Sequence, residues 1–130
     1  MPNPLLPSLP HTIPQAFARM EGFYVEGPTP NRPQRNHNPG DIEYGIFATH
    51  FGATGTDGRF AIFPDDETGM SCLITLLSGP VYRNLTLEAG INKYAPPVEN
   101  QTNEYVALVC QWSGRQPTDI IGDYVSAPAQ

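Results

Sequence analysis

The sequence is poor in basic residues and has a single lysine. Seven Lys and Arg stand against 13 Asp and Glu, which gives a net charge of −6 over 130 residues. Proteins that bind duplex nucleic acid neutralise its phosphates with grouped Lys and Arg, and the chain has no such basic stripe. We therefore expect no nucleic-acid partner. Electrostatic steering toward any other anionic polymer is also disfavoured.

Long apolar runs are missing as well. No segment approaches the roughly 20 apolar residues that a membrane-spanning helix needs. The first residues, MPNPLLPSLPHTIP, have neither the basic start nor the apolar centre of a signal peptide. We expect no membrane insertion and no signal peptide, so that work outside a cytoplasm would need assisted delivery.

Motifs for common cofactors and nucleophiles are absent. The chain contains no G-x-S-x-G, Walker, G-x-G-x-x-G or HExxH pattern. Cys72 and Cys110 each lie in an apolar helical pattern, which favours two small core residues over a disulfide. His37, Asp41 and His50 do not have the spacing of a metal site. We expect neither a metal nor another cofactor.

The composition predicts one folded domain with many turns. Hydrophobic residues make up 39% of the chain, and Gly (12) and Pro (15) are abundant. Residues 1–11 carry four prolines, which favours an extended N-terminal arm. Residues 12–130 are predicted to form a single domain.

The hydrophobic periodicity predicts an α+β fold. A first helix follows an N-cap at Thr12 and stops at Gly22 or Gly27. Proline-rich residues 28–40 predict a loop, and residues 42–63 predict a small hairpin or three-stranded sheet with a turn at Asp57-Gly58. Three helices and a short terminal helical turn are expected in the second half, within 65–77, 86–95, 102–114 and 118–130.

Glu21 is the first candidate for chemistry. It follows Met20 at the edge of the apolar face of the first helix, one turn after Phe17. Loss of hydration and the negative end of the helix dipole both raise the pKa of a Glu side chain, which suits a general acid. The alternative is a surface Glu beside a Gly C-cap.

Two further segments carry dense turn chemistry. RNHNPGDIEYG, residues 35–45, implies a rigid loop with a type II turn at Pro39-Gly40, either lining a site or simply entering a strand. INKYAPPVENQTNEY, residues 91–105, presents Tyr and Asn at a stiff corner. Such a corner suits sugar binding, or it joins two helices around a core Tyr.

Together these segments resemble a known family. EGF at a helix end, RNHNPGDIEYG, GATGTDGRFAIFP and YRNLTLEAGINKYAPPVENQTNEYV occur in the order found in small phage and prophage proteins of the lysozyme superfamily. That family is similar to lytic transglycosylases and muramidases, including virion-associated ones. The resemblance covers residues 16 to about 112.

The resemblance implies that Glu21 is the catalytic acid, donated by the first helix into a cleft between an α lobe and a small β lobe. Glu21 would protonate the glycosidic oxygen between N-acetylmuramic acid and N-acetylglucosamine in bacterial peptidoglycan. The residues that the resemblance implies for substrate binding are Asn38, Gly40, Tyr44, Tyr94 and Asn100.

The 35–43 loop departs from the family pattern, which reads Arg-Asn-Asn-Asn-Pro-Gly-Asn-Ile-Arg. His37, Asp41 and Glu43 stand where Asn, Asn and Arg are usual. Asp41 is therefore a candidate second carboxylate, and Asp57 is a weaker one. With a single carboxylate a transglycosylase route is expected, whereas a second carboxylate would permit hydrolysis by water.

The expected function is that of a bacteriolytic, peptidoglycan-cleaving glycosidase of the lytic transglycosylase or muramidase type. It would reach the cell wall as a phage endolysin, in the virion with virion components as partners, or as an effector delivered by a secretion apparatus. The main alternative is a virion structural or glycan-binding protein that keeps a lysozyme-like fold with little or no activity.

Overall fold

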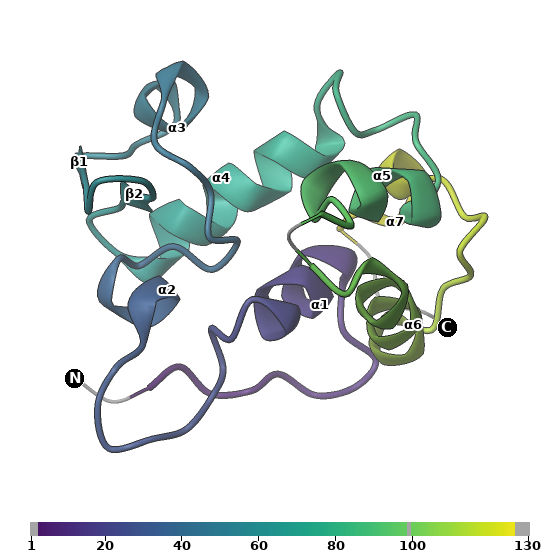
Figure 1. The fold of residues 1–130 in the computed structure, drawn as a ribbon, viewed down its shortest axis with the longest axis horizontal. Coiled ribbons are helices and arrows are strands. Elements are labelled where there is room, and N and C mark those ends of the chain that lie inside the picture. The colour runs from purple at the N-terminus through teal and green to yellow at the C-terminus, as the bar shows by residue number, and fades with distance from the viewer. Residues whose placement is uncertain (1–2, 99, 127–130) are drawn as a thin grey trace. The chain divides into compact units, whose positions relative to one another are not determined.

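The computed structural model describes residues 3–98 and 100–126, which are mainly helical with one small antiparallel sheet (Figure 1). This confirms the predicted α+β class. The elements are α1 (Ile13–Met20), α2 (Arg32–Arg35), α3 (Ile46–His50), β1 (Gly55–Thr56), β2 (Ala61–Ile62), α4 (Asp66–Ser78), α5 (Leu87–Tyr94), α6 (Thr102–Ser113) and α7 (Ile121–Tyr124).

The chain divides into two compact units. The first joins the described part of Met1–Leu6 to Phe17–Thr75, and the second joins Pro7–Ala16 to the described part of Leu76–Gln130. Helices α1 and α4 each contribute residues to both units. The single domain over 12–130 stays a prediction. Among the described residues, no helix combines the length and apolar character needed to cross a membrane.

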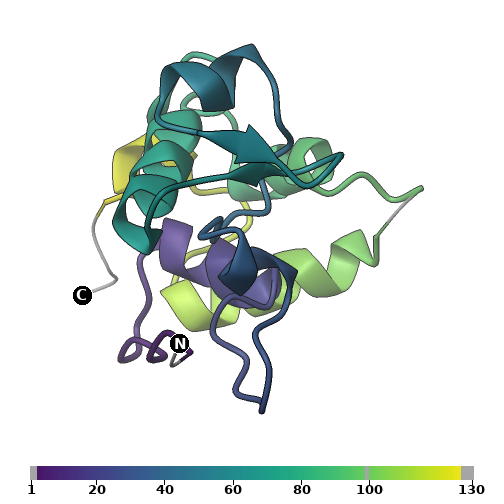
Figure 2. The same ribbon diagram turned by 90° about the vertical axis from the view of Figure 1, so that its left-hand side faces the viewer.

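The sheet of the first unit is a two-stranded hairpin. Gly55 pairs with Ile62 and Thr56 with Ala61. The turn between the strands contains Gly58 at φ 115°, as the Asp57-Gly58 pair predicts. Figures 1 and 2 show α3 on the same side of this unit as the hairpin.

Two expectations for this region were wrong. Residues 42–63 are not mainly β, because Ile46–His50 form helix α3, and the ring of Phe47 in this helix lies 4.7 Å from that of the C-cap residue Phe51. Short runs of aromatic and β-branched residues are compatible with a strand or with a helix, and here the contact between the two rings accompanies the helical conformation. Likewise, residues 28–40 are not all loop, since α2 begins after an N-cap at Asn31.

The turn at Pro39-Gly40 is not type II. The Asp41 amide donates to the Asn38 carbonyl at 3.0 Å, which closes the turn, but Gly40 is not among the positive-φ glycines. A type II turn would need positive φ at this position. The left-handed residues are His37 (φ 49°) and Asp41 (φ 50°), on either side of the turn.

The 37–41 loop packs directly on α4. A Cβ atom placed on Gly69 would collide with the His37 carbonyl and with the Pro39 ring. Helix α4 therefore requires glycine here so that the loop backbone can approach. The helix begins as predicted, with Asp66 and Glu67 in its first turn.

The core of the first unit contains several phenylalanines and takes residues from α1, the hairpin and α4. Its buried apolar side chains include Phe17, Phe23, Ile42, Phe60, Phe63, Cys72 and Leu73.

The second unit gathers α5, α6 and α7 (Figure 1). Thr86 caps α5, α6 ends at Gly114 with φ 70°, and α7 is the predicted terminal turn. Gly90 of α5 faces Ile121 of α7 so closely that a side chain would clash. The buried apolar side chains here include Ile13, Leu77, Tyr82, Leu87, Ile91, Tyr105, Val109 and Ile121.

Candidate functional site

Glu21 ends α1 in a well-defined C-terminal motif. The Gly22 amide donates to the Arg19 carbonyl at 3.1 Å and the Phe23 amide to the Ala18 carbonyl at 3.0 Å, the two bonds of a Schellman motif. Gly22 adopts the left-handed conformation (φ 94°) that this motif requires. The predicted stop at Gly22 is confirmed, and Glu21, half-buried, is the C-cap residue.

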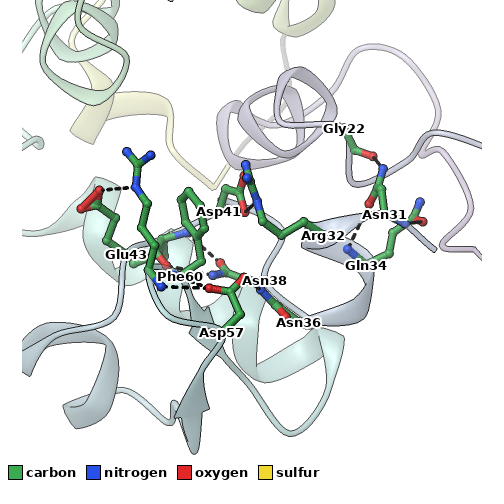
Figure 3. A network of polar contacts seen from close by, with 12 residues as sticks. Gly22, Asn31, Arg32, Gln34, Asn36, Asn38, Asp41, Glu43, Asp57 and Phe60 are labelled. Atoms are coloured by element: carbon green, nitrogen blue, oxygen red, sulfur yellow. Dashed lines mark hydrogen bonds and ion pairs between the residues drawn. The ribbon is translucent and has the colours of Figure 1, made fainter. Parts of the chain in front are cut away.

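The backbone after Glu21 is clamped by α2 (Figure 3). Asn31 and Gln34 form a capping box, in which each side chain accepts a hydrogen bond from the other residue's backbone amide. The same two side chains donate outward. Asn31 Nδ2 bonds the Gly22 carbonyl at 2.8 Å, and Gln34 Nε2 bonds the carbonyls of Phe23 and Val25 at 2.9 and 2.7 Å. The turn that carries Glu21 is thus fixed by side chains from a separate element.

Arg32 is the charged residue that sequence reasoning missed. Its Nε and Nη2 donate to the two carboxylate oxygens of Asp41, and its guanidinium lies 4.0 Å from the Phe60 ring centroid. We call Arg32, Asp41 and Phe60 the Arg32 cluster (Figure 3). The hydrogen bond to Asp41 raises the pKa of Arg32, and the charges of Asp41, Asp57 and Glu21 act in the same direction. All three predicted carboxylates therefore act on one guanidinium.

Asp41 is committed to this cluster. Its side chain is 4% exposed and binds Arg32 through both oxygens. The bidentate arrangement holds the carboxylate in place and compensates its charge. A role as second catalytic carboxylate stays a prediction, but the geometry gives Asp41 a clear structural task.

Asp57 closes the hairpin turn. Its carboxylate accepts from the amides of Arg59 (3.0 Å) and Phe60 (2.8 Å) and from Asn36 Nδ2 (2.9 Å). These hydrogen bonds lower the pKa of Asp57 from 3.8 to about 2, and the bonds from the two backbone amides have the largest effect. Asp57, too, is used by the fold, as its turn position suggests.

We expect the Asp57 interactions to make stability acid-sensitive. A carboxyl whose pKa is lower in the folded state stabilises the protein above its unfolded pKa, and this contribution disappears as the pH falls from about 4 through about 2. Urea unfolding at pH values from 5 to 2 should show a smaller acid-induced loss of stability in Asp57→Asn than in the wild type. Asp123→Asn serves as the charge-matched control. Parallel pH profiles for the wild type and Asp57→Asn would contradict the expectation.

Asn38 is an internal brace of the loop. It is fully buried, and its side chain bonds the amide and carbonyl of Ile42 and the carbonyl of Ala61, each at 2.9 Å. Gly40 is also buried. Direct ligand contact by these two residues stays a prediction, while the structure shows Asn38 joining the loop to the hairpin.

The other predicted sugar-binding residues lie at the surface or near it. Tyr44 is 47% exposed and lines a shallow hollow of about 520 Å³ beside α3. In the second unit, Tyr94 is half-buried with its ring centroid 6.0 Å from that of Tyr82. Asn100 lines an open hollow at the start of α6. The structure therefore pairs Asp41 with Arg32, whose pKa the charges of Glu21 and Asp57 also raise, and it places Tyr94 and Asn100 in the other unit.

No metal centre is found within residues 3–98 and 100–126, because no three His, Cys, Asp or Glu side chains group as ligands there. His37 instead lies 2.7 Å, Nδ1 to Oδ1, from Asp66, and His50 packs edge-on against Phe51. Both cysteines are free thiols, Cys72 buried and Cys110 half-buried, which agrees with the predicted absence of a disulfide.

Burial raises the pKa of Cys72 from 9.0 to about 11, and it also raises the pKa of Cys110. Because the thiolate is the reactive form, we expect Cys72 to react roughly 100-fold more slowly with a thiol reagent at pH 7 than in denaturant. In a Cys110→Ser variant Cys72 is the remaining thiol, so that its reaction can be followed alone. Denatured protein, never reduced, should titrate two thiols; fewer would contradict the free-thiol structure.

Comparison with known proteins gives no relative. No protein-family model matches the chain, no curated protein does, and no solved structure matches its fold.

The structure gives the three carboxylates different surroundings. Asp41 pairs with the Arg32 guanidinium, and Asp57 accepts from backbone amides of the hairpin turn, while Glu21 is the C-cap of α1 on a backbone held by Asn31 and Gln34. A carboxyl group on a fixed backbone can exchange a proton with a bound group without a backbone movement.

Proposed function

We propose that this protein cleaves the β-1,4 bond between N-acetylmuramic acid and N-acetylglucosamine in peptidoglycan, on a lysozyme-like fold and with Glu21 as general acid and base. The observation that carries the proposal is the position of Glu21 at the C-cap of α1, on a turn fixed by Asn31 and Gln34. The ordered resemblance of four sequence segments to phage lysozyme-superfamily proteins supplies the reaction class.

The proposed reaction uses one carboxyl group. Glu21 donates its proton to the glycosidic oxygen as the bond between that oxygen and C1 of the muramic acid breaks. The resulting carboxylate then takes the proton of the C6 hydroxyl of the same sugar, whose oxygen bonds to C1 and forms a 1,6-anhydro ring. Glu21 is therefore protonated again at the end of the reaction, and no water is consumed.

The interactions of the other two carboxylates, Asp41 and Asp57, support this route over hydrolysis. A retaining hydrolase needs a second carboxylate free to attack or stabilise C1. Asp41 gives both oxygens to Arg32, and Asp57 holds the hairpin turn. Asp41, which stands where the resembled family has Asn, is thus engaged in an ion pair with Arg32.

Purified peptidoglycan of several wall types provides the direct test. We expect the protein to release soluble glycan fragments from at least one of them. A protein that sediments with the wall but releases nothing would instead be the glycan-binding or virion structural protein of the alternative reading. No release from any wall type rejects the enzyme proposal.

A further inference from the structure

A small hollow in the first unit has no part in the proposed cleavage. It has a volume of about 240 Å³ and is more enclosed than the hollow at Tyr44. Its walls carry charges of both signs, with Arg35 at the end of α2 and Asp66 at the start of α4, and the His37 ring also lines it. Prolines 4 and 30 supply apolar surface.

The basic side of the hollow is a guanidinium. Arg35 has five N–H donors, and Nη1 donates to the Pro30 carbonyl at 3.0 Å, which fixes the direction of the side chain. A guanidinium held in this way presents its remaining donors as a planar fork, the geometry that matches a carboxylate.

The acidic side is an oriented carboxylate. Asp66 Oδ1 lies 2.7 Å from His37 Nδ1, and the Asp66 side chain is 47% exposed. When Asp66 is ionised, the hydrogen of this bond lies on Nδ1, and His37 donates it to Oδ1. The second carboxylate oxygen, Oδ2, takes no part in this bond. The pKa of Tyr24 is raised to about 12, first by burial of its side chain and second by the negative charge of Asp66.

The walls are held rigidly. His37 adopts φ 49° and its carbonyl lies against Gly69, which fixes its backbone, and the contact of Nδ1 with Asp66 orients its ring. Gln34 is fixed by its bonds to the 23–25 turn, and Asn3 Nδ2 donates to the carbonyls of Val25 and Gly27, at 3.2 Å each. Preorganised walls lower the entropic cost of binding a small ligand.

We propose that this hollow binds a zwitterionic amino-acid group, an ammonium and a carboxylate carried on one carbon, with Arg35 on the carboxylate and Asp66 on the ammonium. A ligand with only a negative charge would be repelled by Asp66, and a ligand with only a positive charge would be repelled by Arg35. The volume admits an amino-acid head group but is too small for a glycan chain. The proposal needs no assumption about glycan cleavage.

This chemistry has two sources. One is a free amino acid, and the other is a peptide with such a group on a side chain, as in a wall stem peptide that contains meso-diaminopimelate. Calorimetry with free meso-diaminopimelate, and separately with a disaccharide-tripeptide fragment carrying it, distinguishes them. Binding of the free compound alone assigns a small-molecule site, and tighter binding of the fragment assigns recognition of the stem peptide.

Variants and ligand analogues test the assignment of the two charges. Arg35→Gln and Asp66→Asn should each weaken meso-diaminopimelate binding at least about 10-fold, the effect of one lost charge-assisted hydrogen bond. Arg83→Gln and Glu67→Gln, which remove the same charges outside the hollow, should bind like the wild type. Acetylating both amino groups or amidating both carboxyl groups of the ligand should have the effect of the corresponding variant.

Three outcomes would overturn the proposal: no binding of either compound at millimolar concentration, binding that neither variant weakens, or equal binding of the acetylated ligand. Thermal unfolding of each variant shows whether it is folded, so that a loss of binding is assigned to the site. Because binding is measured without cleavage, this result is separable from that of the proposed glycosidase activity.

Discussion

Glu21→Gln is expected to lower the release of soluble fragments from peptidoglycan by about 10²–10⁴-fold, the usual contribution of a positioned general acid. Gln has nearly the shape of Glu but cannot deliver a proton. The backbone at this position is set by the Schellman motif and by Asn31 and Gln34, none of which uses the Glu21 side chain. The substitution should therefore leave the fold and wall binding unchanged.

Glu26→Gln is the matched control for this experiment. Glu26 is an exposed glutamate of the same turn region, five residues further on, and the same change of charge there should leave the rate within about twofold of wild type, as expected of a surface substitution. Sedimentation with insoluble wall measures binding for each variant. Equal fragment release by wild type and Glu21→Gln would remove Glu21 from the mechanism.

Asn38→Ala is expected to lower the free energy of unfolding by about 3–5 kcal/mol. The substitution deletes three hydrogen bonds of 2.9 Å and leaves the Ile42 amide, the Ile42 carbonyl and the Ala61 carbonyl without this partner. The Ile42 carbonyl keeps its bond from the Ala61 amide at 2.9 Å. A buried polar group left without any partner costs about 1–3 kcal/mol, and such costs add only in part. Because Asn38 is fully buried, water cannot replace the amide without local opening.

Urea unfolding monitored by far-UV circular dichroism measures this effect. The matched control is Asn92→Ala, which removes an exposed Asn whose amide bonds only the Glu88 carbonyl one turn earlier in α5. We expect the control to stay within about 0.5 kcal/mol of wild type. If Asn38→Ala were also that stable, the loop would not depend on this brace.

The predictable parts of the fold were those with local signals. Thr86 before α5, Gly114 after α6 and the acidic first turn of α4 each mark a helix end through short-range chemistry, and each helix was found where expected. Helix α2 was missed although its signal is also local, because Asn31 and Gln34 stand three residues apart as a capping box.

Other features depend on contacts that the sequence does not announce. Helix α3 could be interpreted as a strand, because the short segment Ile46–His50, which begins with the apolar residues Ile, Phe and Ala, fits both periods. The turn at Pro39-Gly40 had the composition of a type II turn, but the left-handed residues adjoin it. The approach of the loop to Gly69 of α4, about 30 residues along, is not encoded in either segment alone.

The sequence suggested candidate site residues but not the pairings between them. Glu21, Asp41 and Asp57 could be selected as carboxylates near turns. Arg32 could not, since nothing local links it to Asp41, nine residues later, or to Phe60 on the hairpin. The pairing gives Asp41 a structural role, while its role as a second catalytic carboxylate stays a prediction.

The most direct test of the proposed mechanism is the mass of the fragments that the wild-type protein releases from purified peptidoglycan. A single carboxylate acting as acid and then as base predicts fragments ending in 1,6-anhydro-N-acetylmuramic acid, lighter by one water than hydrolysis products and absent with Glu21→Gln. Fragments with reducing ends would contradict the single-carboxylate mechanism and return attention to Asp41 and Asp57. No fragments at all would contradict the enzymatic function itself.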